Sequence, residues 1–374
     1  MNKSIKLLLL LLFTIRLPVC TAQTGEELYK NAVLLRTISG YATQSNNENL
    51  RGIYGFDVGY AVNLEPKPKE WSRFLNAKDV IWTIYWRNLN GLKTSNNQVM
   101  SFGNAWGISM SANFQLWDAR FVQFDFIPTI GISYFSRTSF VQYSTAGVGS
   151  QINDLVSAEV KATVPLNKQL SVFAGGNYMH FSNAGFKNPN GGISTKNIEL
   201  GLRANFNRVR PNDSLRNFSY LHPLGSSFEF SAGIGKRGVF DSHRGLYRSG
   251  LYGGYNYFFN QALALKVGVD GWYYYTVYDP AQPNETFQEE GTSFDHWSAG
   301  ISIGTDIAMN RFVVNGQVGK YIHFNGLDPT VKWYWYGGFR YYLTPELGIQ
   351  STVYIHRTTA DYINWGLVYR FKRF

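Results

Sequence analysis

The chain has 374 residues, of which 17% are aromatic and only 16% are charged, against a usual charged share of about 25%. Its 37 glycines stand beside only 12 prolines, which excludes a collagen-like or a proline-rich disordered chain. Beyond the N-terminus no apolar run approaches the roughly 18 residues of a membrane helix, so a helical membrane bundle is excluded. Many aromatic residues and glycines with few charges are instead typical of a transmembrane β-barrel.

The first residues predict an exported protein. Two lysines precede the apolar stretch 7–13, and the small residues Cys20 and Ala22 predict that a signal peptidase cuts before Gln23. Lipidation of Cys20 is the alternative. Cleavage would lower the formal charge from +10 to +7, because residues 1–22 contain three basic residues and no acidic ones. The mature chain would contain no cysteine, which excludes disulfides and thiol chemistry.

Apolar and polar residues alternate with a period of two along much of the chain. From Gly107 to Trp117 one face is apolar and the other polar, and residues 121–134 repeat the pattern after a tight turn. In the segment 263–269 leucine and valine again alternate with other residues, among them Lys266. A soluble β-sandwich could show the same alternation, so the lengths of the connections supply a second argument.

The predicted strands define connections of two kinds. We predict strands over residues 33–42, 51–63, 78–89, 106–117, 121–135, 155–164, 169–182, 197–207, 226–237, 247–258, 262–276, 295–309, 311–322, 332–343, 347–358 and 362–374. Tight turns at one end contrast with long loops at the other, as in outer-membrane barrels; the turns lie at Asp118, Asn167, Asn260, Asn310 and Pro345, and the loops at 90–105, 136–154, 183–196 and 277–294. The connections 64–77 and 208–225 fit less well, because they are long but would be periplasmic. The terminal aromatic Phe374 is expected of a last barrel strand.

The halves of the chain look like a weak internal duplication. Tyr178-Met179-His180 and Tyr354-Ile355-His356 occupy similar places within them. We expect a signal peptide, a first barrel half carrying the candidate site, a linker and a second barrel half, over residues 1–22, 23–207, 208–225 and 226–374. The expected fold is all-β, a transmembrane antiparallel β-barrel of about 16 strands. Two eight-stranded barrels are the alternative.

The common motifs of metal, nucleotide and hydrolase sites are missing. The six histidines have no spacing that builds a metal site, and the sequence contains neither a P-loop nor a G-x-S-x-G elbow. We therefore expect no metal, no organic cofactor and no nucleic-acid partner. His323 and His356 are interpreted as polar rim residues. Three basic residues could pair with phosphates, although such residues are normally just solvated: Lys187, Arg244 and Arg248.

One strand end carries residues suited to nucleophilic catalysis. His180 and Ser182 are two residues apart, so both side chains emerge on one face, where an imidazole can deprotonate a hydroxyl. The same face is apolar further along the strand, which predicts that the pair lies on the lipid-facing wall. Asn183 and the amide of Gly185 follow the serine and could donate hydrogen bonds to an oxyanion.

The run His180–Gly192, H-F-S-N-A-G-F-K-N-P-N-G-G, resembles the H-x-S-N-A/G motif of the PagL-type lipid A 3-O-deacylases. These are outer-membrane barrels that remove an ester-linked acyl chain from lipopolysaccharide. The resemblance implies His180 as general base and Ser182 as nucleophile, with Asn183 and Gly185 near the oxyanion. The second half, with its run 235–238, resembles the extended acyloxyacyl hydrolase-like proteins of Bacteroidetes-type bacteria.

The chain departs from that motif at the third catalytic position. Where the family has a glutamate, this chain has Ser194, and Glu199, the nearest acid, is predicted to face the lumen. The pair would then be oriented by Ser194 or Asn190, would recruit an acid from another loop, or would be slow or inactive.

The expected function is that of an outer-membrane serine esterase acting on the lipid A of lipopolysaccharide in the outer leaflet. The alternatives are a non-catalytic porin-like or structural barrel and a phospholipase-like enzyme that uses the same pair. The removed acyl chain and a homodimer are left open by the sequence.

Overall fold

A computed structural model describes residues 28–42, 53–66, 68–93, 99–119, 121–138, 147–188, 190–209, 224–238, 245–277, 281, 294–326, 330–356 and 359–371. Several predictions therefore lie outside the described residues: the signal peptide, nearly all of the linker 208–225, Arg244 and Phe374. Among the described residues, no helix is long and apolar enough to cross a membrane.

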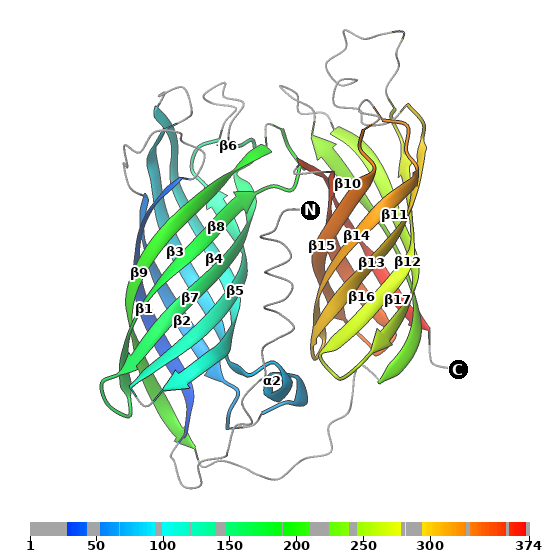
Figure 1. Cartoon of the computed structure of the whole chain (residues 1–374). Coiled ribbons are helices and arrows are strands. Elements are labelled where there is room, and N and C mark those ends of the chain that lie inside the picture. Colours follow the sequence, from blue (N-terminus) through cyan, green and yellow to red (C-terminus); the bar gives the residue numbers. More distant parts are fainter. Residues whose placement is uncertain are drawn as a thin grey trace.

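The first half of the chain forms a closed antiparallel barrel (Figure 1). Its strands are β1 (Leu28–Ala42), β2 (Ile53–Asn63), β3 (Ala77–Lys93), β4 (Val99–Ala119), β5 (Val122–Phe135), β7 (Ile152–Pro165), β8 (Leu170–Ser182) and β9 (Asn190–Val209). Pairing of β1 with β9 closes the ring, with Leu34 opposite Arg203. The short β6 (Gly147–Val148) pairs with the start of β9, and the helix α2 (Glu70–Phe74) follows β2.

The second half forms its own closed barrel of eight strands. These are β10 (Gly225–Gly238), β11 (Gly245–Phe258), β12 (Leu263–Tyr274), β13 (Trp297–Met309), β14 (Phe312–His323), β15 (Trp333–Tyr342), β16 (Leu347–His356) and β17 (Thr359–Phe371). Each strand pairs with its neighbours in the chain, and β10 pairs with β17, with Phe230 opposite Tyr369.

The all-β transmembrane barrel fold is confirmed, as two eight-stranded barrels rather than the single 16-stranded barrel that the sequence favoured. The two awkward connections have a physical reason in this arrangement. Residues 64–77 contain α2, and the connection after β9 has to lead to a second barrel. Strands β3, β4 and β9 also extend further than predicted, so that the loops after β3 and β8 are shorter than expected.

Alternation of side chains sorts the second barrel into an apolar outer wall and a polar interior. Leu265, Val267 and Val269 are exposed on the outside, whereas Lys266 is fully buried inside. Lys266 Nζ and Arg340 Nη1 each lie 2.6 Å from Glu229 Oε1. The Tyr342 hydroxyl donates to the other carboxylate oxygen of Glu229 at 3.0 Å. This carboxylate therefore holds together side chains from two other strands, β12 and β15.

Replacement of Glu229 by alanine should destabilise the second barrel by about 3–5 kcal/mol, because it leaves buried cations without their partner. The measurement is urea unfolding in lipid vesicles, followed by the gel shift that unheated folded barrels show. Glu346→Ala, which removes a partly exposed acid from a turn, is the matched control and should unfold like the wild type. Equal urea midpoints of unfolding for the wild type, Glu229→Ala and Glu346→Ala would contradict a stabilising role of Glu229.

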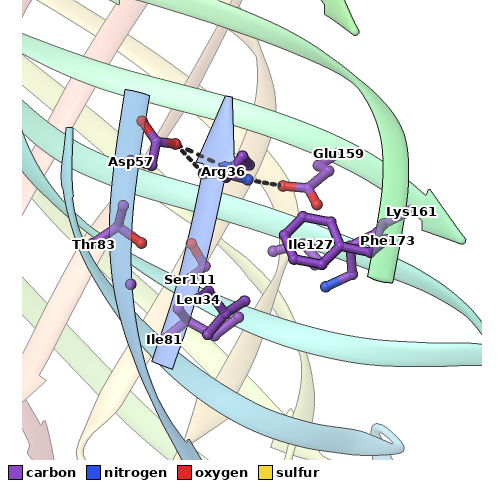
Figure 2. Close-up of a pocket in the computed structure, with 11 residues that line it drawn as sticks. Leu34, Arg36, Asp57, Ile81, Thr83, Ser111, Ile127, Glu159, Lys161 and Phe173 are labelled. Atoms are coloured by element: carbon purple, nitrogen blue, oxygen red, sulfur yellow. Dashed lines mark hydrogen bonds and ion pairs between the residues drawn. The ribbon is translucent and has the colours of Figure 1, made fainter. Parts of the chain in front are cut away.

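Ionic side chains also fill the interior of the first barrel (Figure 2). Arg36 Nε donates to Asp57 Oδ2 at 2.7 Å, and Arg36 Nη1 lies 2.7 Å from Glu159 Oε2. The adjoining cavity measures about 20 Å³, which is room for about one water molecule. Eight-stranded barrels have an interior that side chains can fill, and these residues do so.

Candidate active site

The candidate pair lies at the end of β8, on the outer wall of the first barrel. Along this strand Met179 and Phe181 point inward and are buried, whereas Tyr178 is 45% exposed. His180 and Ser182 share the outward face with Tyr178 and are partly exposed. The end of β8 that carries the pair lies at the other end of the barrel from the tight turn 166–169, as the sequence predicted.

Ser194 holds the imidazole of His180. The two residues are register partners on β8 and β9, and His180 Nδ1 lies 2.8 Å from Ser194 Oγ. The other ring nitrogen, Nε2, lies over Gly192: a Cβ atom added there would be 3.0 Å from Nε2 and 2.5 Å from Cε1. Because Gly192 has no side chain, there is room for the imidazole ring of His180 at this position.

The hydroxyl of Ser182 is held by Asn190 and by the loop that follows the strand. Asn190 Nδ2 donates to Ser182 Oγ at 3.0 Å, and the backbone N–H of Ala184 donates to the same oxygen at 3.1 Å. No hydrogen bond joins Ser182 to His180, both of which are described. Catalytic hydrogen bonds are often long in ligand-free enzymes and tighten when substrate binds.

Asn183 and Gly185 shape the loop beside the serine. Asn183 Nδ2 donates to Ser150 Oγ at 2.8 Å and to the carbonyl of Lys187 at 2.7 Å, so this amide braces the loop. Ala184 and Gly185 both have positive φ, 52° and 81°. This left-handed turn aims the Ala184 amide at Ser182 Oγ, a donor that the sequence motif did not single out.

An acid that the sequence analysis missed lies beside the serine. Asp154 on β7 is the direct register partner of Ser182, and its neighbours Ile152 and Val156 mark the exposed outer face. The signal was present in the sequence, because an acidic residue among outward apolar residues of a membrane strand is costly and is a functional candidate by default. Glu199, in contrast, points into the lumen, where it binds Arg36 and Asn177.

The other residues considered from the sequence are divided between rim and interior. His323 is exposed, with its Nε2 atom 3.0 Å from Asp295 Oδ2, and Arg248 is fully buried against Asp361. Lys187 belongs to the loop after Ser182. Within the described ranges, no group of three or more His, Cys, Asp or Glu side chains is arranged to hold a metal ion.

Replacing Gly192 by alanine should lower kcat about 100-fold, because the added methyl group would displace the His180 ring. The φ of 69° at this position adds backbone strain. The measurement is the rate of fatty-acid release by the purified barrel. Gly176→Ala on the neighbouring strand β8 is the control, since the atom nearest to the added Cβ would be an ordinary 3.7 Å away. Wild-type turnover in Gly192→Ala would show that the ring does not depend on this space.

The fold and the paired residues together define an outer-membrane β-barrel with a serine and a histidine on its outer wall. Residues 54–203 match the family model of lipid A 3-O-deacylase (PagL), and residues 226–373 match that of the acyloxyacyl hydrolase C-terminal domain. The protein belongs to this PagL-type deacylase and acyloxyacyl hydrolase family. It is therefore an outer-membrane protein of a family of hydrolases that act on the acyl esters of lipid A.

Solved structures show similar barrels at low sequence identity. The outer-membrane enzyme PagL is 17% identical, covering 45% of this chain and 97% of its own, with a TM-score of 0.33. Neisserial surface protein A is 12% identical, covering 47% and 97%, with a TM-score of 0.32. CdiB from Acinetobacter baumannii is 11% identical, covering 92% and 60%, with a TM-score of 0.19. A comparison with curated protein sequences gave no match.

Proposed function

We propose that the protein is a serine esterase that removes an acyl chain from lipid A, with Ser182 as nucleophile and His180 as general base. The observation that carries this proposal is the hydrogen bond between His180 Nδ1 and Ser194 Oγ, on an outer wall that a membrane lipid can reach. It leaves Nε2 as the nitrogen that accepts the proton of the serine.

The proposed reaction begins when Ser182 Oγ turns from Asn190 toward His180 Nε2. His180 takes the hydroxyl proton while the oxygen attacks the ester carbonyl, and the protonated imidazole then returns the proton to the leaving alkoxide. Water hydrolyses the acyl-enzyme with His180 again as base. The amides of Ala184 and Gly185 are the proposed donors to the oxyanion. Asn183 would join them once its side-chain amide turns from Ser150 or from the Lys187 carbonyl.

Asp154 is our candidate for the acid that position 194 lacks. It is a diagonal neighbour of His180, and such neighbours lie about 7–8 Å apart across a sheet. At this distance its charge would stabilise the imidazolium through space, while Ser194 fixes the orientation of the ring.

Asp154→Asn should shift the acid limb of the pH–rate profile toward lower pH by about half a unit. The sign follows because loss of the carboxylate disfavours the protonated imidazole, so the active neutral form persists to lower pH. Initial rates across the pH range measure the shift. Glu65→Gln, at the far end of the barrel, should leave the profile unchanged; superimposable profiles for all three proteins would exclude Asp154 from this role.

Processing and domain roles belong to the same proposal. Residues 1–22 would be a signal peptide, and residues 23–207 would carry the catalytic site. Residues 208–225 would link this unit to a second, non-catalytic barrel over residues 226–374. The substrate partner would be lipopolysaccharide in the outer leaflet.

Release of fatty acid by purified protein tests the proposal. Wild type should deacylate lipopolysaccharide, whereas Ser182→Ala should not. Release from phospholipid but not from lipopolysaccharide would favour the phospholipase-like alternative. Because side chains fill the first barrel, we also expect no ion conductance in planar bilayers; stepwise conductance without esterase activity would instead support a porin-like protein.

A further inference from the structure

We propose that the second barrel is a working part of the active site: its rim holds the loop Asn183–Asn188, here called the nucleophile loop, in the conformation that catalysis needs. This inference rests on the proposed function of Ser182. It assigns the positioning role to Gly238, the last residue of β10.

Two hydrogen bonds join the nucleophile loop to that rim. The backbone N–H of Gly238 donates to the carbonyl of Gly185 at 2.7 Å, and Asn188 Nδ2 donates to the carbonyl of Gly238 at 2.8 Å. The backbone N–H and the backbone carbonyl of Gly238 in the second barrel thus both form hydrogen bonds with the nucleophile loop of the first barrel.

The two backbones approach so closely that side chains are excluded between them. A Cβ atom at Gly238 would lie 2.5 Å from both Lys187 Cα and the backbone nitrogen of Asn188. A Cβ atom at Gly185 would lie 3.1 Å from the carbonyl oxygen of Asp361 on β17. The loop is therefore docked on both β10 and β17.

Side chains extend the contact around Phe186. Its ring packs edge-on against Trp365 with centroids 5.7 Å apart, and Lys236 Nζ lies 5.5 Å from the ring centroid. At the opposite end of the barrels, Trp71 of α2 packs in one apolar cluster with Ala262, which lies in the turn before β12. The barrels are thus attached to each other at both ends (Figure 1).

The docked segment is directly continuous with the nucleophile. It begins one residue after Ser182, and its Ala184 amide donates to Ser182 Oγ. Movement of Gly185 would carry this donor away, and misplacement by about 1 Å can cost a factor of 100 in rate. Since the loop acts on the reacting groups, its displacement should lower kcat and leave KM nearly unchanged.

Gly238→Ala in the full chain tests the proposal. Gly238 does not have positive φ, so alanine is strained there only through its contact with the loop. We expect kcat for fatty-acid release to fall 10- to 100-fold with KM within twofold, and the amides of residues 183–188 to exchange hydrogen faster. Gly316→Ala is the matched control, because a Cβ atom there meets nothing within 4 Å. It should behave like the wild type in both measurements.

A second variant and the exchange measurement keep the outcomes distinct. Asn188→Ala, which removes the donor to Gly238, should lower kcat in the same direction if Gly238→Ala fails to fold. An active wild type with full turnover in both variants would overturn this inference while leaving the esterase intact. A wild type as inactive as Ser182→Ala would defeat the proposed function; unchanged loop exchange in Gly238→Ala would then also overturn the docking.

Discussion

Ser182→Ala is expected to abolish fatty-acid release, with kcat falling by about 10⁴-fold or more. No other group replaces the nucleophile, because the remaining donors only polarise the ester and leave a slow attack by water. The barrel itself should stay folded, since the serine lies at the end of β8 and, among the residues that the structure describes, its hydroxyl forms hydrogen bonds with Asn190 and Ala184. Rates measured on purified, heat-modifiable protein give the comparison.

Ser171→Ala is the matched control for this loss. Ser171 is on the same strand but is buried, at the turn end of β8. It should retain wild-type turnover. A Ser182→Ala protein that releases fatty acid as fast as Ser171→Ala would exclude the proposed mechanism.

His180→Ala is expected to cause a loss of similar size, about 10⁴-fold in kcat, because the serine hydroxyl is a weak nucleophile without a base. The wild-type rate should also fall as the pH is lowered, since a protonated imidazole cannot accept the serine proton. Initial rates from pH 5 to pH 9 measure both effects. This pH range is centred near the ordinary pKa of a histidine side chain, about 6.5.

His323→Ala is the control for the histidine, because His323 lies exposed on the other barrel, hydrogen-bonded to Asp295. It should keep both the rate and the pH profile of the wild type. Equal activity of the two histidine variants would remove His180 from the reaction.

The sequence predicted the positions and faces of the strands better than it predicted which strands pair with each other. Alternation around Lys266 assigned inner and outer faces correctly, because a membrane barrel must separate them residue by residue. Closure depends on long-range pairing, such as Leu34 with Arg203, which no local pattern encodes. The same sixteen strand patterns fit one ring or two, and only the pairings of β1 with β9 and β10 with β17 decide.

The two halves of the chain place His180 and His356 at similar positions, but the two side chains face opposite sides of their barrels. His180 and His356 both lie near the ends of the seventh strands of their barrels. His180 faces outward beside Tyr178, whereas Tyr354 is buried and His356 Nε2 lies 3.1 Å from the buried Asp361. A shift of one residue in the pleat reverses every side chain, so the second barrel does not repeat the candidate pair.

Local features of the site were predictable, and contacts across strands were not. Spacing alone put His180 and Ser182 on one face. The sequence left Ser194 and Asn190 open as the residue that orients the pair, and in the structure Ser194 Oγ lies 2.8 Å from His180 Nδ1. Asp154 and Gly238 come from other strands, Gly238 from the other barrel, so their proximity follows only from the assembled fold.

The most direct test of the central claim is mass spectrometry of lipid A from cells that express the wild type or Ser182→Ala. The expected result is lipid A that lacks one acyl chain in the wild-type cells alone, with equal amounts of folded protein in both outer membranes. Identical lipid A in the two strains, with both proteins folded, would contradict the assignment of this protein as a lipid A esterase.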